Sequence, residues 1–168
     1  MREKVIRVKD KQEIVYSDED WALLRRIRKE ASELMTVLAQ NGIPSAVHGS
    51  VARGDVSPTS DVDIFIPMQI SSFKVELSLR SSNINFTSRR IELATPQHAI
   101  KAHIDTDLNR TITFPLVSPK RREWEFYRFG GVIDFEELNQ GKRVAGVDKR
   151  LLLIEPNPKG HYESAITG

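Results

Sequence analysis

The sequence has no cysteine among its 168 residues. This absence excludes a disulfide framework, a thiol nucleophile and a zinc site built from cysteine. Any bound metal ion must therefore be held by carboxylate, histidine or carbonyl groups. A chain without cysteine also suits a reducing compartment, so we expect a cytoplasmic location.

The sequence also lacks a long apolar run and a large excess of either charge. No uninterrupted apolar stretch approaches the ~20 residues needed to cross a bilayer, and the charged residues 1–16 do not resemble a signal peptide. Twenty-five basic and 23 acidic residues give a net charge of +2. We therefore expect a soluble protein with no membrane partner, in which any contact with a polynucleotide comes from local patches.

Residues 17–41 predict the longest helix. Ser17 and Asp20 have the spacing of a capping box, and Asn41-Gly42 is a typical helix stop. Between them, apolar residues recur every three or four positions: Trp21, Leu24, Ile27, Ala31, Leu34 and Leu38.

The remaining pattern predicts an α+β (α/β) fold with a mixed β-sheet flanked by helices. The expected elements are a hairpin (4–8 and 13–16), strands (43–48, 61–66, 89–93), helices (71–82, 120–129, 134–140), a second hairpin (99–105 and 110–117) and a late strand (151–156). We expect a core at 1–117, with its N-terminal hairpin and helix, and a small C-terminal extension at 118–168 that packs on this core.

The segment HGSVARGDVSPTSDVDIFI, residues 48–66, is the most informative part of the chain. Gly49 and Ser50 follow a predicted strand and open a turn, where backbone N–H groups can point at an anion. Arg53 lies about one helical turn later and could bind phosphate oxygens in a bidentate manner.

Asp61 and Asp63 are two positions apart on a predicted strand, so their side chains share a face. Carboxylates held this close repel each other unless a cation lies between them. Hard oxygen ligands with open positions suit Mg²⁺ shared with substrate phosphates. The plainer alternative is a polar turn followed by an exposed strand edge.

Together these residues resemble the signature of the polymerase-beta-like nucleotidyltransferase superfamily. The matching residues are Gly49-Ser50, Arg53-Gly54 and Ser60-Asp61-x-Asp63, followed by apolar residues 64–66. The short spacing is most similar to the minimal nucleotidyltransferases and to small archaeal members of the group. The specific match covers about 19 of the 168 residues.

The resemblance implies a nucleotidyltransferase fold and a metal-dependent transfer. Gly49, Ser50, Arg53 and Ser60 would bind a nucleoside triphosphate, expected to be ATP. Asp61, Asp63 and a third carboxylate would bind two Mg²⁺ (or Mn²⁺) ions, so the transfer would follow a two-metal mechanism. A nucleoside monophosphate would pass to a hydroxyl of an unknown acceptor (RNA, protein or small molecule) with release of pyrophosphate.

The third carboxylate has three candidates. Glu92 lies between apolar residues on a predicted strand, about thirty residues after the aspartate pair, which resembles the usual placement in the superfamily. Asp105 and Asp107 are the alternatives, at the end of a later strand and in the turn after it.

Other readings remain open. A catalytically weak or inactive chain could act as an antitoxin-like or RNA-binding interaction module, although the intact Gly-Ser and Asp-x-Asp patterns favour an enzyme. The acceptor, the preferred base and a possible oligomer are left undetermined.

Several other residues have a structural and a functional interpretation. We expect His48 to be a structural residue of its strand or to orient the glycine loop, with a catalytic base as the alternative. We expect Lys101 and His103 to lie on an exposed face, with contacts to substrate phosphates as the alternative. An aromatic group is expected to pack between helix and sheet, with stacking on a nucleobase as the alternative: Trp124, Phe126, Tyr127 and Phe129. A basic group on the same helix either faces solvent or contacts the acceptor: Lys120, Arg121, Arg122 and Arg128.

Overall fold

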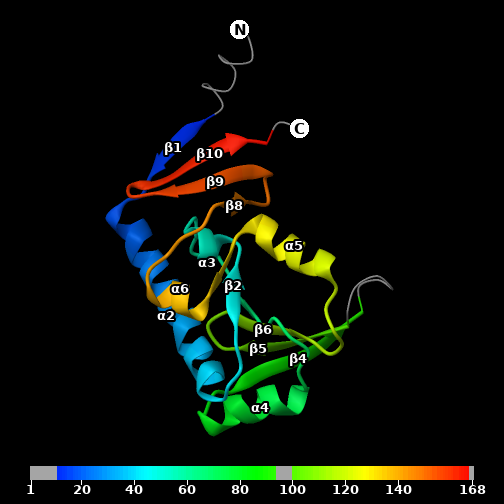
Figure 1. Ribbon diagram of the computed structural model, residues 1–168. Coiled ribbons are helices and arrows are strands. Elements are labelled where there is room, and N and C mark those ends of the chain that lie inside the picture. The colour runs from blue at the N-terminus through cyan, green and yellow to red at the C-terminus, as the bar shows by residue number, and fades with distance from the viewer. Residues whose placement is uncertain (1–10, 94–99, 167–168) are drawn as a thin grey trace.

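Two β-sheets and the helices around them form the structure, a computed structural model that describes residues 11–93 and 100–166 (Figure 1). The six-stranded central sheet has the order β4-β5-β6-β3-β2-β7, and a four-stranded sheet has the order β1-β10-β9-β8. The strands are β1 (Gln12–Val15), β2 (Ala46–His48), β3 (Val62–Phe65), β4 (Phe86–Glu92), β5 (Lys101–Thr106), β6 (Arg110–Pro115), β7 (Val132–Asp134), β8 (Gly146–Val147), β9 (Leu152–Asn157) and β10 (Gly160–Ala165). The helices are α2 (Asp18–Gln40), α3 (Ser50–Arg53), α4 (Ser72–Ser81), α5 (Arg121–Gly130) and α6 (Phe135–Asn139).

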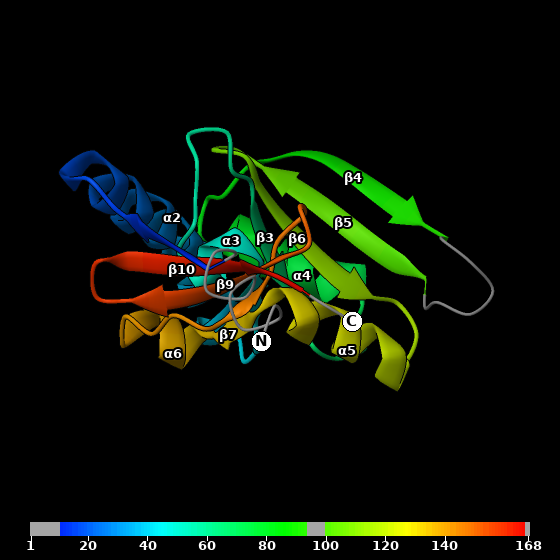
Figure 2. The same ribbon diagram turned by 90° about the horizontal axis from the view of Figure 1, so that it is seen from above.

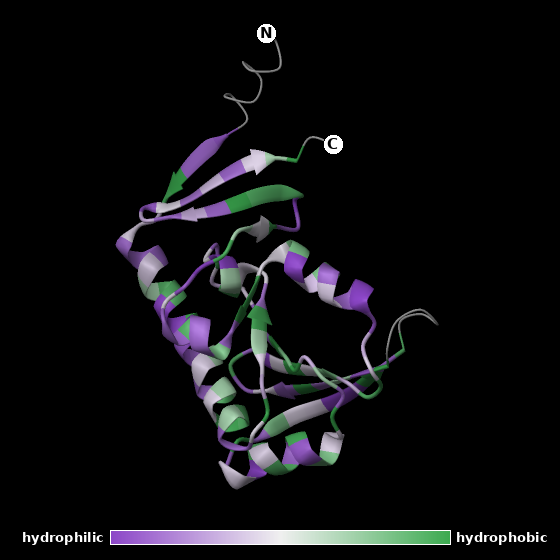
Figure 3. Cartoon of the chain, viewed as in Figure 1, coloured by the Kyte–Doolittle hydropathy of each residue, from purple (hydrophilic) through white to green (hydrophobic). Residues whose placement is uncertain are grey.

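The predicted long helix is confirmed as α2. The Ser17 side chain accepts a hydrogen bond from the Asp20 N–H at 3.1 Å, and the Asp20 carboxylate accepts one from the Ser17 N–H at 2.9 Å. Hydrophilic and hydrophobic segments follow one another along α2 (Figure 3), and its buried residues recur every three or four positions. The apolar stripe is buried and includes Leu34 and Leu38.

The central sheet is mixed, as expected, because β3 and β6 run parallel while its other neighbouring strands are antiparallel. One face of this sheet supplies the core against α2 and α4. Its buried residues alternate along each strand: Val62 and Ile64, Ala102 and Ile104, Ile112 and Phe114. Side chains at the intervening positions must therefore lie on the opposite face.

The opposite face of the central sheet carries polar side chains in register. Asp63 on β3 is paired with Thr111 on β6, which is paired with Asp105 on β5. The three side chains are only partly buried. This polar row starts at one of the two aspartates of the sequence motif.

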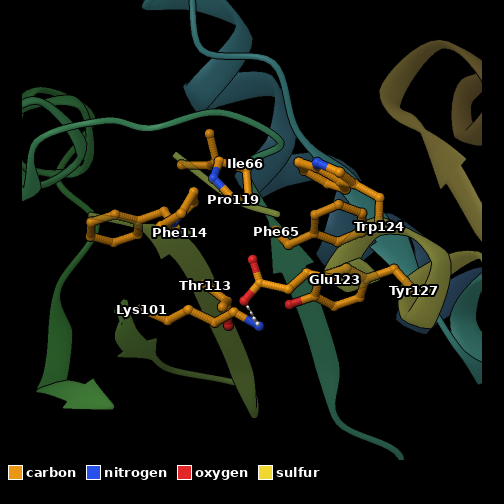
Figure 4. Close-up of a pocket in the computed structure, with 10 residues that line it drawn as sticks. Phe65, Ile66, Lys101, Thr113, Phe114, Pro119, Glu123, Trp124 and Tyr127 are labelled. Atoms are coloured by element: carbon orange, nitrogen blue, oxygen red, sulfur yellow. Dashed lines mark ion pairs between the residues drawn. The ribbon is translucent and has the colours of Figure 1, made fainter. Parts of the chain in front are cut away.

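One side of helix α5 packs on part of this polar face of the sheet. The ring of Tyr127 stacks on that of Phe65, with centroids 4.3 Å apart, and Trp124 lies beside them (Figure 4). The buried Glu123 carboxylate is 3.7 Å from the Lys101 ammonium and accepts a hydrogen bond from the Lys120 N–H. A cavity of about 20 Å³ remains between helix and sheet, which is room for about one water molecule.

The C-terminal part of the chain contributes to both sheets. Strand β7 extends the central sheet beside β2. Strand β1 from the N-terminal part lies alongside β10 and pairs with it (Figure 2). The expected N-terminal hairpin has its first strand, residues 4–8, outside the described residues. The boundary expected at residue 117 therefore does not coincide with a boundary between the two sheets, since each sheet contains strands from both sides of that residue.

Three strands of the C-terminal part have no counterpart among the predicted elements: β7, β8 and β10. Apart from residues 4–8, the predicted elements are present with shifted ends, and α5 begins after Pro119 as expected. Among the described residues, no helix has the length and apolar content needed to cross a membrane.

Candidate active site

A sharp turn at Gly49 joins β2 to the short helix α3. Gly49 has a φ of 76°, which a residue with a side chain rarely adopts. Its carbonyl accepts hydrogen bonds from the N–H groups of Ala52 and Arg53, and its own N–H donates to the Gly131 carbonyl at 3.0 Å. The first-turn N–H groups of Ser50 and Val51 have no acceptor within a helix, so they are the donors that the turn can offer to an anion.

Arg53 is buried and bound to the protein rather than extended toward the solvent. Its Nε and Nη2 each donate to one carboxylate oxygen of Asp55 at 2.9 Å, and its Nη1 donates to the Gly130 carbonyl at 2.7 Å. The two nitrogens that a bidentate grip on phosphate would use are both bound to Asp55. This geometry favours a positioning role for Arg53, which ties the loop to the end of α5.

Two further arginines fix the far end of α3. Arg28 donates to the carbonyls of Val51 and Ala52, both at 3.0 Å, and burial lowers its pKa to about 10. Arg143 donates to the Arg53 carbonyl at 2.8 Å and to the Gly160 carbonyl at 2.9 Å. These cations satisfy the free carbonyls at a helix C-terminus, so they hold the glycine turn in place.

Sequence reasoning missed the roles of Arg28, Asp55 and Arg143. Arg28 belongs to no sequence motif, and its partners are more than twenty positions away. Arg143 reaches a carbonyl 90 positions away. The only local signal was the Arg-x-Asp spacing of Arg53 and Asp55.

The predicted aspartate pair lies at the start of β3. Asp63 alternates with the buried Val62 and Ile64, and its side chain is about half exposed. Asp61 lies just before the strand and is exposed. The Ser60 hydroxyl accepts a hydrogen bond from the Ser57 N–H at 2.8 Å, so it stabilises the turn that leads into the pair.

His48 lies beside the pair, on the neighbouring strand. Its Nε2 is 3.9 Å from an Asp63 carboxylate oxygen, and its ring packs edge-on against that of Tyr127 at 4.8 Å. Burial lowers the pKa of His48 below its ordinary value, while the Asp63 charge acts in the opposite direction. Burial therefore favours the neutral imidazole, and the structural or loop-orienting role of His48 stays a prediction.

These residues open onto a cleft of about 600 Å³, a size typical of small-molecule sites. One wall, which we call the motif wall, contains the expected site residues: Gly49, Ser50, Arg53, Ser60, Asp61 and Asp63. The facing wall, which we call the C-terminal wall, comes from α5 and the turn between β8 and β9: Phe126, Phe129, Gly130 and residues 147–151.

The candidate third carboxylates lie outside this cleft. The Glu92 carboxylate is hydrogen-bonded to the His103 ring. In the strand register, Glu92 on β4 is opposite Lys101 on β5, which is opposite Pro115 on β6. That register places Glu92 three strands across from Asp63 and about 13 Å farther along the strands. The structure therefore does not bring Glu92 to the aspartate pair.

Of the two remaining candidates, Asp105 and Asp107, Asp105 is the one in register with Asp63. It lies in the same row as Asp63, two strands away, or about 10 Å. Hydrogen bonds from Ser88 and then Arg90 are the largest causes that lower the pKa of Asp105 to about 2. Asp107 lies in the turn after β5, where its carboxylate binds Arg110.

The donor set fits a magnesium ion held by two protein carboxylates. Within residues 11–93 and 100–166, no three histidine or carboxylate side chains are grouped closely enough to form a metal cage. Mg²⁺ does not need such a cage, because it is commonly bound through one or two carboxylates plus substrate phosphates and water. Asp61 and Asp63 offer hard oxygen atoms at an open cleft, as this mode of binding requires.

A mixed sheet that brings a glycine turn and paired aspartates to one cleft defines the class of proteins built on the nucleotidyltransferase fold. The family model described as "Nucleotidyltransferase domain" matches residues 24–145, which is most of the chain. The chain therefore belongs to this family, and the resemblance based on residues 49–66 is confirmed. No curated protein and no solved structure matches the chain.

Proposed function

We propose that this chain is a Mg²⁺-dependent enzyme that transfers a nucleoside monophosphate from a nucleoside triphosphate, ATP in the first instance, to an acceptor hydroxyl. The acceptor is an RNA, a protein or a small molecule. The supporting observation is that the Gly49-Ser50 turn and both motif aspartates line one cleft, in a chain that belongs to the nucleotidyltransferase domain family.

In this proposal the first turn of α3 binds the triphosphate, and Asp61 and Asp63 bind Mg²⁺ or Mn²⁺. When bound, the metal ion would neutralise phosphate charge and make the acceptor hydroxyl easier to ionise. The acceptor oxygen forms a bond to the α-phosphorus, the bond from the α-phosphorus to the bridging oxygen breaks, and pyrophosphate leaves. The hydroxyl proton is released to water.

The residues behind the loop contribute by positioning. Arg28 and Arg143 hold the C-terminal end of α3, and the Gly49 N–H holds the other end on the Gly131 carbonyl, so the turn is preorganised before the nucleotide arrives. Alignment of the reacting groups supplies a large part of catalysis in phosphoryl transfer. Asp105, which shares a row with Asp63, is a better candidate than Glu92 for a supporting negative charge.

The test uses each of the four ribonucleoside triphosphates, labelled in turn at the α- and γ-phosphate. The purified chain is incubated with Mg²⁺ and with separate RNA, protein and small-molecule fractions of cell extract. We expect α-label, but not γ-label, to enter one fraction, and Asp63→Asn to abolish the incorporation. If the folded chain transfers no label to any fraction, the proposal fails, and metal- and nucleotide-independent retention of RNA would point to a binding module.

A further inference from the structure

Helix α5 exposes two large aromatic side chains toward the cleft. Phe126 is 73% exposed and Phe129 is 55% exposed, and both line the C-terminal wall. They are three positions apart, so they lie on one side of the helix. Trp124 and Tyr127 occupy another side and pack against Phe65. The expected packing of all four aromatics on the sheet therefore applies to only two of them.

A third exposed apolar residue lines the same wall. Leu151 is 64% exposed and has a φ of +63°, a left-handed conformation that is costly for a leucine. Such a conformation persists only where the surroundings impose it. Asp148 imposes it here, since its carboxylate accepts hydrogen bonds from the N–H groups of Arg150 and Leu152, both at 3.0 Å.

The turn that carries Leu151 is also anchored to the small sheet. The Arg150 guanidinium donates to Glu163 on β10 at 2.9 Å, and Glu163 in turn lies 3.1 Å from the buried His161 ring. The three exposed apolar residues, Phe126, Phe129 and Leu151, are therefore carried by two fixed backbone segments, helix α5 and a turn held by charged hydrogen bonds. Because the backbone of both supports is held in place, binding of a planar ligand restricts only the rotamers of these side chains.

The cleft is thus divided into a polar motif wall and an apolar part of the C-terminal wall. A nucleoside triphosphate is divided in the same way, into a charged phosphate chain and a flat apolar base. We propose that Phe126, Phe129 and Leu151 form a slot, here called the base slot, that binds the nucleobase of the donor triphosphate. This inference rests on the proposed function. Leu151 lies beyond the matched residues 24–145, so the family model does not cover this part of the slot.

Stacking is tolerant of base identity, because every base has an aromatic face. The base slot is therefore expected to bind all four bases, with the larger purines bound a few-fold more tightly. Its contribution is separable from that of the phosphate loop. Inorganic triphosphate has the phosphate chain of the donor without the ribose and the base. A loss of ATP affinity in the slot variants without a loss of triphosphate affinity therefore measures the contribution of the slot.

The experiment measures binding of ATP and of inorganic triphosphate, each with Mg²⁺, by titration calorimetry on the full chain. The variants are Phe126→Ala, Phe129→Ala and the double substitution. The matched control is Phe73→Ala on α4, because Phe73 is 72% exposed and lies outside the cleft. We expect the double variant to bind ATP at least ~10-fold more weakly, with triphosphate binding unchanged and the control like wild type.

The outcomes separate this inference from the proposed function. If the wild-type chain binds neither ATP nor triphosphate, the proposed function fails first. If it binds both and the double variant keeps the wild-type ratio, the base slot is overturned while the proposed function stands. If donor affinity is unchanged but the acceptor fraction must be more concentrated for transfer, the apolar group serves the acceptor and the inference is also overturned.

Discussion

The two walls of the cleft are built in different ways. The motif wall comes from one short stretch, residues 48–63, whose turn, helix and strand follow one another directly. The C-terminal wall combines the end of α5 with the turn between β8 and β9, and that turn is held by a strand paired with the N-terminal β1. A wall made of neighbouring residues leaves a recognisable sequence pattern, whereas one assembled from distant segments leaves only scattered exposed side chains.

The walls also differ in what holds them. Half-buried arginines bind the backbone of the motif wall, while the C-terminal wall rests on aromatic packing and on a turn around Asp148. We therefore expect changes in the motif wall to abolish chemistry or loosen the loop. Changes in the C-terminal wall should alter which ligand binds and how tightly.

The largest effect is expected at the aspartate pair. Asp61→Asn or Asp63→Asn should lower transfer by at least ~10²-fold, because charge stabilisation at the reacting phosphate is lost. The unfolding temperature without metal should stay the same or rise slightly, since one of two like charges is removed. Labelled-nucleotide transfer and thermal unfolding are the measurements, and full activity in Asp63→Asn contradicts the assignment.

The next effect concerns the loop that the arginines hold. Gly54 has a φ of 110°, and an added Cβ would overlap the Arg143 guanidinium. Gly54→Ala combines backbone strain with this clash, so it should destabilise the fold by roughly 2–4 kcal/mol and weaken triphosphate binding. Gly42→Ala is the control, because Gly42 has a φ of 72° with open space around it. Equal losses of unfolding free energy in the two variants would show that the Arg143 contact contributes nothing.

Sequence patterns predicted the elements whose stabilising contacts are local. The capping box at Ser17 and Asp20 defined the start of α2, and the alternation at residues 61–66 predicted β3. Strand β10 was missed because its mostly polar residues show no clear alternation, and its partner β1 lies about 145 positions earlier in the chain. Pairing over such a separation cannot be read from local periodicity.

The candidate site divides in the same way. The glycine turn and the aspartate pair were predicted together, and both line the cleft. Glu92 was preferred because it lies between apolar neighbours, a pattern typical of a buried strand. In the structure β4 is an edge strand, and Ile91 and Leu93 are both exposed. The pattern indicated a strand but contained no information about its register.

The choice between Asp105 and Glu92 gives an intermediate effect. Asp105→Asn should lower transfer by roughly 10-fold, since its charge shares a row with Asp63 but lies about 10 Å away. Glu92→Gln should change transfer by less than about 2-fold. The pKa of Asp105, about 2, keeps it ionised throughout the usual assay range. A larger loss in Glu92→Gln than in Asp105→Asn would restore the assignment made from the sequence.

A smaller effect is expected where the C-terminal wall stores strain. Asparagine tolerates the left-handed region better than leucine, so Leu151→Asn should raise the unfolding free energy by up to ~1 kcal/mol while ATP affinity falls a few-fold. Leu108→Asn is the matched control, since Leu108 is also exposed, has a φ of 57° and lies outside the cleft. It should gain the same stability without any change in ATP affinity. A loss of triphosphate affinity in Leu151→Asn would mean that the turn supports the phosphate loop instead.

The smallest effect is expected on acceptor use, and it should distinguish Arg122 from Arg121 on α5. Arg122 lies four positions before Phe126 and so shares its side of the helix, whereas Arg121 is exposed on another side and pairs with Glu125. An acceptor that enters the cleft past the base slot would meet Arg122 but not Arg121. Arg122→Ala should therefore weaken use of a polyanionic acceptor about 2–3-fold at low salt and reduce its salt dependence, with no change in triphosphate affinity. Arg121→Ala should behave like wild type at every salt concentration, because an exposed pair within one helix contributes little. Equal and salt-independent behaviour of the two variants would mean that the basic side chains of α5 serve only to keep the helix surface hydrated.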